Sequence, residues 1–269
     1  MDASSLRQRV TPTSEAPRIF TPEYYARMRD LENAAWWNAG MRETAAMLLA
    51  GAQLGDTGTM LDAGCGSGQT MSWFLKAHPQ WWAVGIDIAS EGLGVAEASG
   101  LSVQQGSVLD LPFADDSFDL VITLDVLQHL PIDGGDARAL DEFARVLRPG
   151  GILLVRTNAQ SFPRISDDRE FSYRRYESAD LRERLRAAGF DVQILGRVNA
   201  LLGLAEIPRE LRARRDNSPA YRGILSQPRR EHSVLRALKL GTLRLEGRAL
   251  AAGWQLPFGR TIFALCRAH

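Results

Sequence analysis

The 269-residue chain contains only two cysteines, two lysines and four histidines. Cys65 and Cys266 are too few for the disulfide framework of a small secreted protein, so we expect a reduced, cytoplasmic protein. The histidines show no metal-ligand spacing with one another or with a cysteine, and we expect no bound metal. No stretch approaches the ~20 apolar residues of a membrane-spanning helix, and the first ten residues lack a secretory apolar segment, so neither feature is expected.

The formal net charge is zero, but the charges are unevenly distributed. Residues 197–269 carry 14 Lys and Arg against 5 Asp and Glu, whereas residues 1–196 carry 18 against 27. A basic C-terminal part favours an anionic substrate, an acidic partner or a membrane surface. A solvated helical face without a partner is the equally weighted alternative.

A glycine-rich turn stands out in residues 60–70. An apolar strand end is followed by Asp62 and then by glycines at alternate positions, Gly64, Gly66 and Gly68, before a helical pattern begins. Glycine lets a ligand approach the backbone, because it has no Cβ and adopts positive φ at little cost. The helix N-terminus behind the turn offers free N–H groups to a carboxylate or phosphate.

A second element, residues 82–88, reads as a buried strand that ends in Asp87. Asp87 lies 23 residues after Gly64, close to the spacing at which a second strand places an acid on ribose hydroxyls. An exposed acid that caps the next helix is the weaker alternative. The sequence therefore favours a nucleoside-containing ligand.

A further buried strand is predicted within residues 116–130, and Asp125 and His129 stand just past its end. Open α/β sheets bind ligands at the carboxyl ends of their strands. We therefore expect both side chains near the glycine turn.

The glycine spacing departs from the dinucleotide fingerprint G-x-G-x-x-G, because the third glycine comes one residue early and Gln69 takes its place. The string Asp-Ala-Gly-Cys-Gly-Ser-Gly, followed in order by the other segments, closely resembles the first motif of class I S-adenosylmethionine-dependent methyltransferases. The N-terminal stretch Glu32-Asn33-Ala34-Ala35-Trp36-Trp37 resembles the one that precedes the core in small-molecule and glycan-associated relatives. The resemblance covers about residues 57–196 and the last strand. It implies S-adenosylmethionine as the cofactor.

The resemblance also implies a set of cofactor contacts. Ser107 stands where relatives commonly have an acid that meets the adenine amine, and a plain strand-to-loop turn is the alternative there. The expected cofactor-binding residues are Asp62, Ala63, Gly64, Cys65, Gly66, Gly68, Asp87, Ile88, Ser107, Val108, Leu124 and Asp125.

The binding site for the methyl acceptor is expected next to the cofactor, where paired aromatic and polar residues lie. His129 is the candidate general base, with a capping or packing role as the alternative. The expected substrate-binding residues are Trp36, Trp37, Gln128, Tyr173, Arg175 and Tyr176.

The alternation of strands and helices predicts a doubly wound, Rossmann-like sheet of seven strands, mainly parallel, whose last strand is implied to be antiparallel. Strands are predicted at 59–63, 82–87, 102–105, 118–124, 151–157, 190–195 and 260–266, and helices at 22–52, 67–77, 90–98, 136–148, 178–188 and 233–252. Residues 1–20 look disordered. Residues 21–269 form the domain, with its core in 57–196 and 259–269 and a helical insertion in 197–258, which we interpret as a lid or substrate subdomain or else as an outer layer.

The expected activity is methyl transfer to a small-molecule acceptor, at oxygen, on a glycan or natural-product intermediate, and an anionic acceptor is one alternative. No nucleic-acid partner is expected, because the sequence has no Asn/Asp-Pro-Pro-Tyr string, no Pro-Cys pair and no appended RNA-binding motif. The alternatives are an RNA or protein methyltransferase and a silent cofactor-binding partner subunit.

Overall fold

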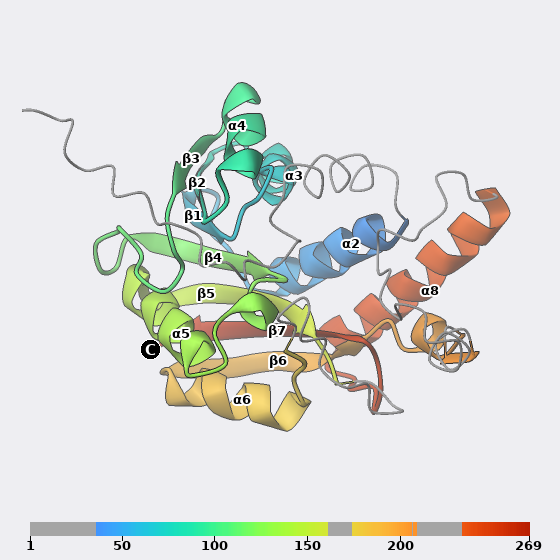
Figure 1. The fold of residues 1–269 in the computed structure, drawn as a ribbon. Coiled ribbons are helices and arrows are strands. Elements are labelled where there is room, and N and C mark those ends of the chain that lie inside the picture. The colour runs from blue at the N-terminus through green and yellow to red at the C-terminus, as the bar shows by residue number, and fades with distance from the viewer. Residues whose placement is uncertain (1–35, 161–173, 206, 209–232) are drawn as a thin grey trace, which may run out of the picture.

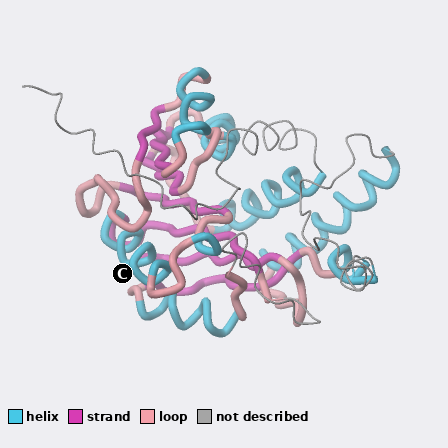
Figure 2. The backbone as a smooth tube through the Cα atoms, viewed as in Figure 1, coloured by secondary structure: helices cyan, strands magenta, loops and turns pink. Residues whose placement is uncertain are grey.

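The computed structural model describes residues 36–160, 174–205, 207–208 and 233–269. The expected disordered N-terminus, the first part of the predicted 22–52 helices, Tyr173 and the arginines of residues 209–215 and 229–230 lie outside these ranges. Figure 2 shows the strands at the centre of the molecule with helices around them.

A single seven-stranded sheet has the order β3-β2-β1-β4-β5-β7-β6. β7 is antiparallel to both of its neighbours, β5 and β6, and the other strand pairs are parallel, as predicted. The strands are β1 (Gly58–Ala63), β2 (Trp81–Asp87), β3 (Ser102–Gln105), β4 (Phe118–Leu124), β5 (Leu147–Asn158), β6 (Phe190–Val198) and β7 (Thr261–Ala268). The helices are α2 (Trp36–Gly51), α3 (Gln69–Ala77), α4 (Ser90–Ala98), the short η2 (Leu127–His129), α5 (Gly135–Val146), α6 (Ser178–Ala187) and α8 (Ser233–Ala251).

The sheet is buried on both faces, because apolar side chains of its central strands point alternately to two cores. On β4, Val121 belongs to the core that α5 and α6 complete, whereas Leu120 and Ile122 belong to the core that α2, α3 and α8 complete. This arrangement explains why the central strands read as continuous apolar runs, and Figure 1 shows α5 and α6 together on one side of the sheet.

The order in which the strands are added to the sheet reverses between β1 and β4. β2 flanks β1 on one side, and β4, which is parallel to β1, flanks it on the other. The connections after these two strands leave in opposite directions along the sheet. Such a switch point is where open α/β sheets bind ligands. The glycine turn after β1 and the segment after β4 both lie there.

The predicted boundary between α5 and β5 was wrong. The helix expected to reach residue 148 ends at Val146, and β5 begins at Leu147, four residues before the expected start. Leu147 is extended and pairs with Phe118. Pro149 disfavours helical backbone at Arg148, which explains why the helix ends ahead of the Pro-Gly-Gly sequence.

The two helices that lie far apart in the sequence, α2 and α8, pack closely against each other (Figure 1). A Cβ added at Gly40 would lie 2.5 Å from Leu243, and one added at Gly247 would lie 2.7 Å from the Thr44 hydroxyl. Buried Glu246 accepts hydrogen bonds from the backbone N–H groups of residues 200 and 201, just past β6. α8 is therefore anchored to both α2 and the end of the sheet.

A fully buried carboxylate, Asp136, joins the segment after β5 to the segment after β4. It forms an ion pair with Arg174, accepts a hydrogen bond from the Tyr176 hydroxyl at 3.2 Å, and lies 3.2 Å from Arg184. Arg174 also donates to the carbonyls of residues 131 and 132. Burial alone would raise the pKa of Asp136, but the hydrogen bond and charge of Arg174, together with Arg184, outweigh it and lower that pKa.

We expect Asp136→Asn to lower the free energy of unfolding at pH 7 by about 3–5 kcal/mol, because removing the charged partner leaves the largely enclosed Arg174 guanidinium uncompensated. Denaturant titration measures this loss, and Asp133→Asn, on the exposed neighbouring loop, is the matched control. Because the folded-state pKa is lowered, the carboxylate stabilises the protein above the unfolded value of roughly 3.9, and this contribution is lost as pH falls through the folded pKa. Equal losses in both variants would contradict the assignment.

Candidate functional site

The glycine turn connects β1 to α3 and is pinned to the end of β2. The N–H groups of Gly64 and Cys65 both donate to the Ile86 carbonyl, at 2.8 and 3.0 Å. The N–H of Gly66 donates to Asp87 Oδ2 at 2.8 Å. The predicted neighbourhood of the glycines and Asp87 is therefore present, and it is held by direct hydrogen bonds.

Positive φ angles and close packing both call for glycine in this turn. Gly64, Gly66 and Gly68 have φ of 88°, 50° and 76°. A Cβ at Gly64 would lie 2.1 Å from Val126, and one at Gly68 would lie 2.4 Å from Leu101. The backbone consequently passes closer to its neighbours than any other residue type permits.

A glycine that the sequence reading missed, Gly92, completes this packing. It is buried in α4, and a Cβ there would lie 2.7 Å from the backbone carbon of Gly66. α4 therefore supports the turn from behind. The available signal was a pair of glycines, Gly92 and Gly94, within a helical pattern, since a glycine there commonly has a packing reason.

Asp87 is 8% exposed and stands at the carboxyl end of β2. Its Oδ1 accepts from the N–H of Ala89 at 2.9 Å, and its Oδ2 accepts from Gly66. Burial raises the pKa of Asp87, while the backbone hydrogen bonds oppose the rise. Each carboxylate oxygen keeps accepting capacity for a further donor, which suits a pair of vicinal hydroxyls.

The predicted adenine-side segment lies beside Asp87. The N–H of Gly106 donates to the Asp87 carbonyl at 3.0 Å, and Ile88 is exposed next to it. Ser107 Oγ accepts from the N–H of Leu109 at 3.2 Å, so the hydroxyl also caps its own turn. Val108 is buried in the core that α5 and α6 complete.

Two residues of the turn region are buried. Asp62 is 2% exposed and Cys65 is 7% exposed. Burial, reinforced by the charges of Asp62 and Asp87, raises the pKa of the Cys65 thiol. The thiol therefore stays protonated at neutral pH and is a packing group rather than a nucleophile.

Asp125, directly after β4, forms an ion pair with Arg156 of β5, with Oδ2 2.5 Å from Nη2. The Arg156 guanidinium lies 4.9 Å from the ring centre of Trp37, one of the expected acceptor residues. The sequence reading missed Arg156, because a single arginine within an apolar strand carries no motif. Trp36 is instead buried in the core that contains α2.

Gln128 and Tyr176 occupy structural positions rather than the open side of a cleft. Gln128 is 1% exposed, and its Oε1 accepts from the Thr157 hydroxyl at 2.9 Å. Tyr176 is 3% exposed, and its hydroxyl contacts Leu127 and Asp136. Both side chains were expected to bind substrate. In the structure they are buried, and their hydrogen bonds join β5 and the residues after it to the segment after β4.

His129 and Arg175 are both half-buried. His129 ends the short η2 helix just past β4, so the structure brings it to the predicted edge of the sheet. Its backbone N–H donates to Val126, the residue that contacts Gly64. The candidate base is thus tied to the segment that touches the glycine turn.

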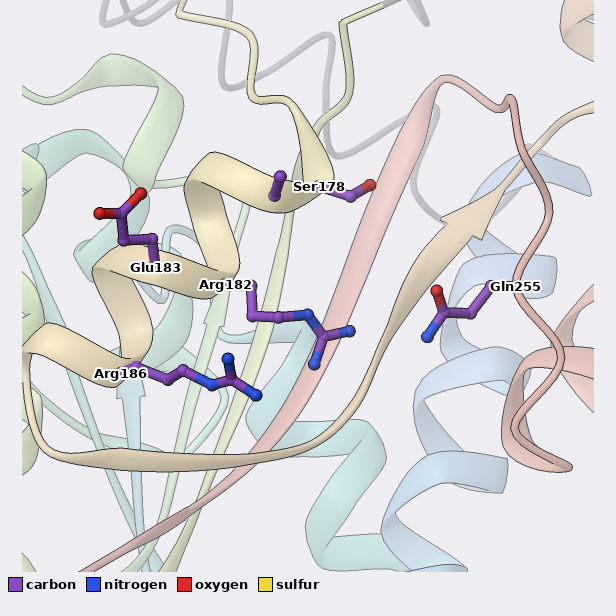
Figure 3. A pocket seen from close by; sticks show the side chains of 6 residues that line it. Ser178, Arg182, Glu183, Arg186 and Gln255 are labelled. Carbon is purple, nitrogen blue, oxygen red and sulfur yellow. The ribbon is translucent and has the colours of Figure 1, made fainter.

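An open groove of about 510 Å³ lies elsewhere, along α6 (Figure 3). Arg182 and Arg186 point into it, and Gln255 faces them from the segment before β7. None of the predicted site residues lines this groove. Across the described ranges, no group of three or more His, Cys, Asp and Glu side chains could hold a metal, and none of the helices combines the length and apolar character needed to cross a bilayer.

Comparison with known proteins matches a methyltransferase domain family to residues 61–155. Over 126 residues, 41% of this chain and 44% of the relative, the chain is 32% identical to a probable methyltransferase, ltbC, of Aspergillus luteorubrus. It is 32% identical over 151 residues to a probable S-adenosylmethionine-dependent methyltransferase of Mycolicibacterium smegmatis, covering 55% and 58% of the two chains. It is 31% identical over 96 residues to a tRNA (carboxymethyluridine(34)-5-O)-methyltransferase of Arabidopsis thaliana, covering 36% and 23%. The chain thus spans less than two thirds of the length of these relatives.

Solved structures share the fold. Phosphoethanolamine N-methyltransferase 2 of Haemonchus contortus with bound S-adenosylmethionine superimposes with a TM-score of 0.63 at 17% identity, over 93% of this chain and 58% of that one. The complex of the Haloferax volcanii Trm112 methyltransferase activator with a methyltransferase gives 0.57 at 23% identity, over 91% and 94%. By its motifs, its sheet order and these matches, the chain is similar to S-adenosylmethionine-dependent methyltransferases, and residues 61–155 match a methyltransferase domain family.

Proposed function

We propose that this protein transfers a methyl group from S-adenosylmethionine to the oxygen of a small-molecule acceptor, with a glycan or natural-product intermediate as the preferred class. The observation that carries the proposal is the hydrogen bond from the Gly66 N–H to Asp87, which joins the glycine turn to the ribose-side acid. The matched family segment, residues 61–155, contains both groups.

The residues present fit the cofactor. Gly64, Gly66 and Gly68 present backbone without a Cβ in the turn, and Asp87 keeps accepting capacity for two hydroxyls. In our assignment the turn holds the methionine part, Asp87 holds the ribose, and Ser107 and Val108 remain the predicted adenine contacts. The bound cofactor supplies a methyl group on a positively charged sulfur, which is already an activated leaving group.

The chain therefore has to align the acceptor with that methyl group and exclude water. An acceptor hydroxyl must also lose a proton, and a neutral imidazole titrates in the required range. We assign this role to His129, because η2 places it at the carboxyl end of β4 and beside Val126.

Methylation of RNA is the second candidate function, and the tRNA methyltransferase relatives favour it. A probable tRNA methyltransferase 9B of Bos taurus is 36% identical over 94 residues. This match covers 35% of this chain and 20% of the relative, so most of both chains lies outside it. The chemical class of the methylated product distinguishes RNA methylation from small-molecule methylation, from protein methylation and from a silent partner subunit, which makes no product.

We expect the protein, incubated with methyl-labelled S-adenosylmethionine and an extract of its source cells, to place label in small molecules. Chromatography and mass spectrometry of the fraction that resists nuclease and protease treatment would identify the product. If nuclease treatment releases the label, the acceptor is RNA and the second candidate function holds instead. Binding of S-adenosylhomocysteine without any labelled product would favour the silent subunit.

We expect Asp87→Asn to weaken binding of S-adenosylhomocysteine by roughly 10- to 100-fold, because hydrogen bonds to a charged group contribute about 1.5–3 kcal/mol. Calorimetry measures the affinity, and a melting curve checks that the turn stays folded. Because burial raises the pKa of Asp87, wild-type affinity should begin to fall in acid at a higher pH than an ordinary aspartate would cause. The variant should lack this dependence, and tighter binding of a nicotinamide dinucleotide to the wild type would contradict the assignment.

We expect Gly92→Ala to weaken S-adenosylhomocysteine binding by about 10-fold, since overpacking costs roughly 1–3 kcal/mol and the added Cβ presses on Gly66. Gly94→Ala is the matched control on the same helix, because no atom lies within 4 Å of its added Cβ. The control should keep full affinity and gain about 0.5–1 kcal/mol of stability. Equal affinities in the two variants would show that α4 does not set the shape of the turn.

A further inference from the structure

Arg156 is a cation at the carboxyl end of β5 whose charged head is largely enclosed. Its side chain is 11% exposed, and both Nε and Nη2 donate to the same oxygen of Asp125, at 3.2 and 2.5 Å. The Trp37 ring covers one face of the guanidinium. Within the described part of the chain, Nη1 makes no hydrogen bond, so one edge of the fork remains available.

The backbone of Asp125 is shaped to maintain this arrangement. Asp125 has a φ of 61°, a left-handed conformation that is uncommon for residues other than glycine. Its N–H donates to the Arg156 carbonyl at 2.8 Å, so main chain and side chain join the same two residues. Unfavourable backbone conformations of this kind concentrate at ligand sites, where the surrounding contacts hold them.

The position of the pair relative to the glycine turn indicates what it faces. Val126, the next residue along, contacts Gly64. In the strand order β2-β1-β4-β5, the end of β5 lies three strand spacings from Asp87, roughly 14 Å at ~4.8 Å each. With the ribose at β2 and the methionine part at the turn, Arg156 lies beyond the cofactor, on the acceptor side.

We propose that Arg156 is a specificity-determining residue that binds an anionic group, a carboxylate or a phosphate, on the methyl acceptor. The inference rests on the proposed function. A guanidinium recognises either anion through its planar fork. Asp125 on one edge and Trp37 on one face orient it in advance, which reduces the entropy lost on binding.

The test uses full-length protein saturated with S-adenosylhomocysteine and two matched pairs of probes. The pair 4-hydroxybenzoate and 4-hydroxybenzamide reports on a carboxylate, and the pair glucose 6-phosphate and glucose reports on a phosphate. Calorimetry should show that one anionic probe binds the wild type at least about 10-fold more tightly than its uncharged counterpart, a difference of about 1.4 kcal/mol. Arg156→Leu should abolish that preference while changing the affinity for S-adenosylhomocysteine less than about twofold.

Arg148→Leu is the control, because Arg148 lies near the other end of the same strand and is also ion-paired, with Asp119. It should keep the anion preference. Since Arg156→Leu leaves Asp125 without its partner, the double variant Asp125→Asn/Arg156→Gln repeats the measurement in a neutral site. A melting curve establishes that each variant is folded.

The proposal is overturned if wild-type protein prefers neither anionic probe, or if the preference survives in both Arg156 variants. It is also overturned if Arg156→Leu weakens S-adenosylhomocysteine but not methylthioadenosine, which lacks the amino-acid part. That result would assign the arginine to the cofactor carboxylate. Failure of the proposed function itself would appear separately, as absent S-adenosylhomocysteine binding or absent methyl transfer to small molecules.

Discussion

The hydrogen bond between the Gly66 N–H and Asp87 is the contact on which the candidate site depends. It joins the ends of β1 and β2, and it holds the glycine turn in a conformation that only glycine tolerates without strain. Burial raises the pKa of the carboxylate that accepts this bond, so the contact is sensitive to acid. Gly92 supports the same turn from α4, so the site is set by packing as much as by polar contacts.

A second constraint operates on the proposed acceptor side, where two ion pairs connect the segment after β4 to the end of β5 and the segment that follows it. Asp136 binds Arg174 in the interior, and Asp125 binds Arg156 at the edge of the sheet. The first pair is fully enclosed at the carboxylate and stabilises the connection, whereas the second keeps part of its guanidinium available. The two ion pairs have the same chemistry and similarly enclosed arginines, but they differ in the burial of the carboxylate and in which edge of the arginine is occupied.

Most of the fold could be predicted from the sequence, because each central strand is an apolar run bounded by glycine, proline or acidic residues. The main boundary error, at Leu147, arose where a strand begins directly after a helix. The helical periodicity of the sequence extended the predicted helix to residue 148. In the structure Leu147 pairs with Phe118, so the strand begins at Leu147 instead. The placement of Gln128 and Tyr176 was also beyond the sequence, because their enclosure depends on loops that approach only in the folded chain.

The sequence alone determined the order of the elements, the glycine turn and the acid at the end of β2, and it carried the resemblance to S-adenosylmethionine-dependent methyltransferases, because these features are local and have a fixed spacing. Only the tertiary structure decided that Gly92 touches Gly66, that Asp125 pairs with Arg156, and that Trp37 covers the guanidinium. Those contacts join residues that lie 26 to 119 positions apart in the chain. Their partners are selected by the order of strands in the sheet and by the packing of α2 and α4 onto it, which no local pattern encodes.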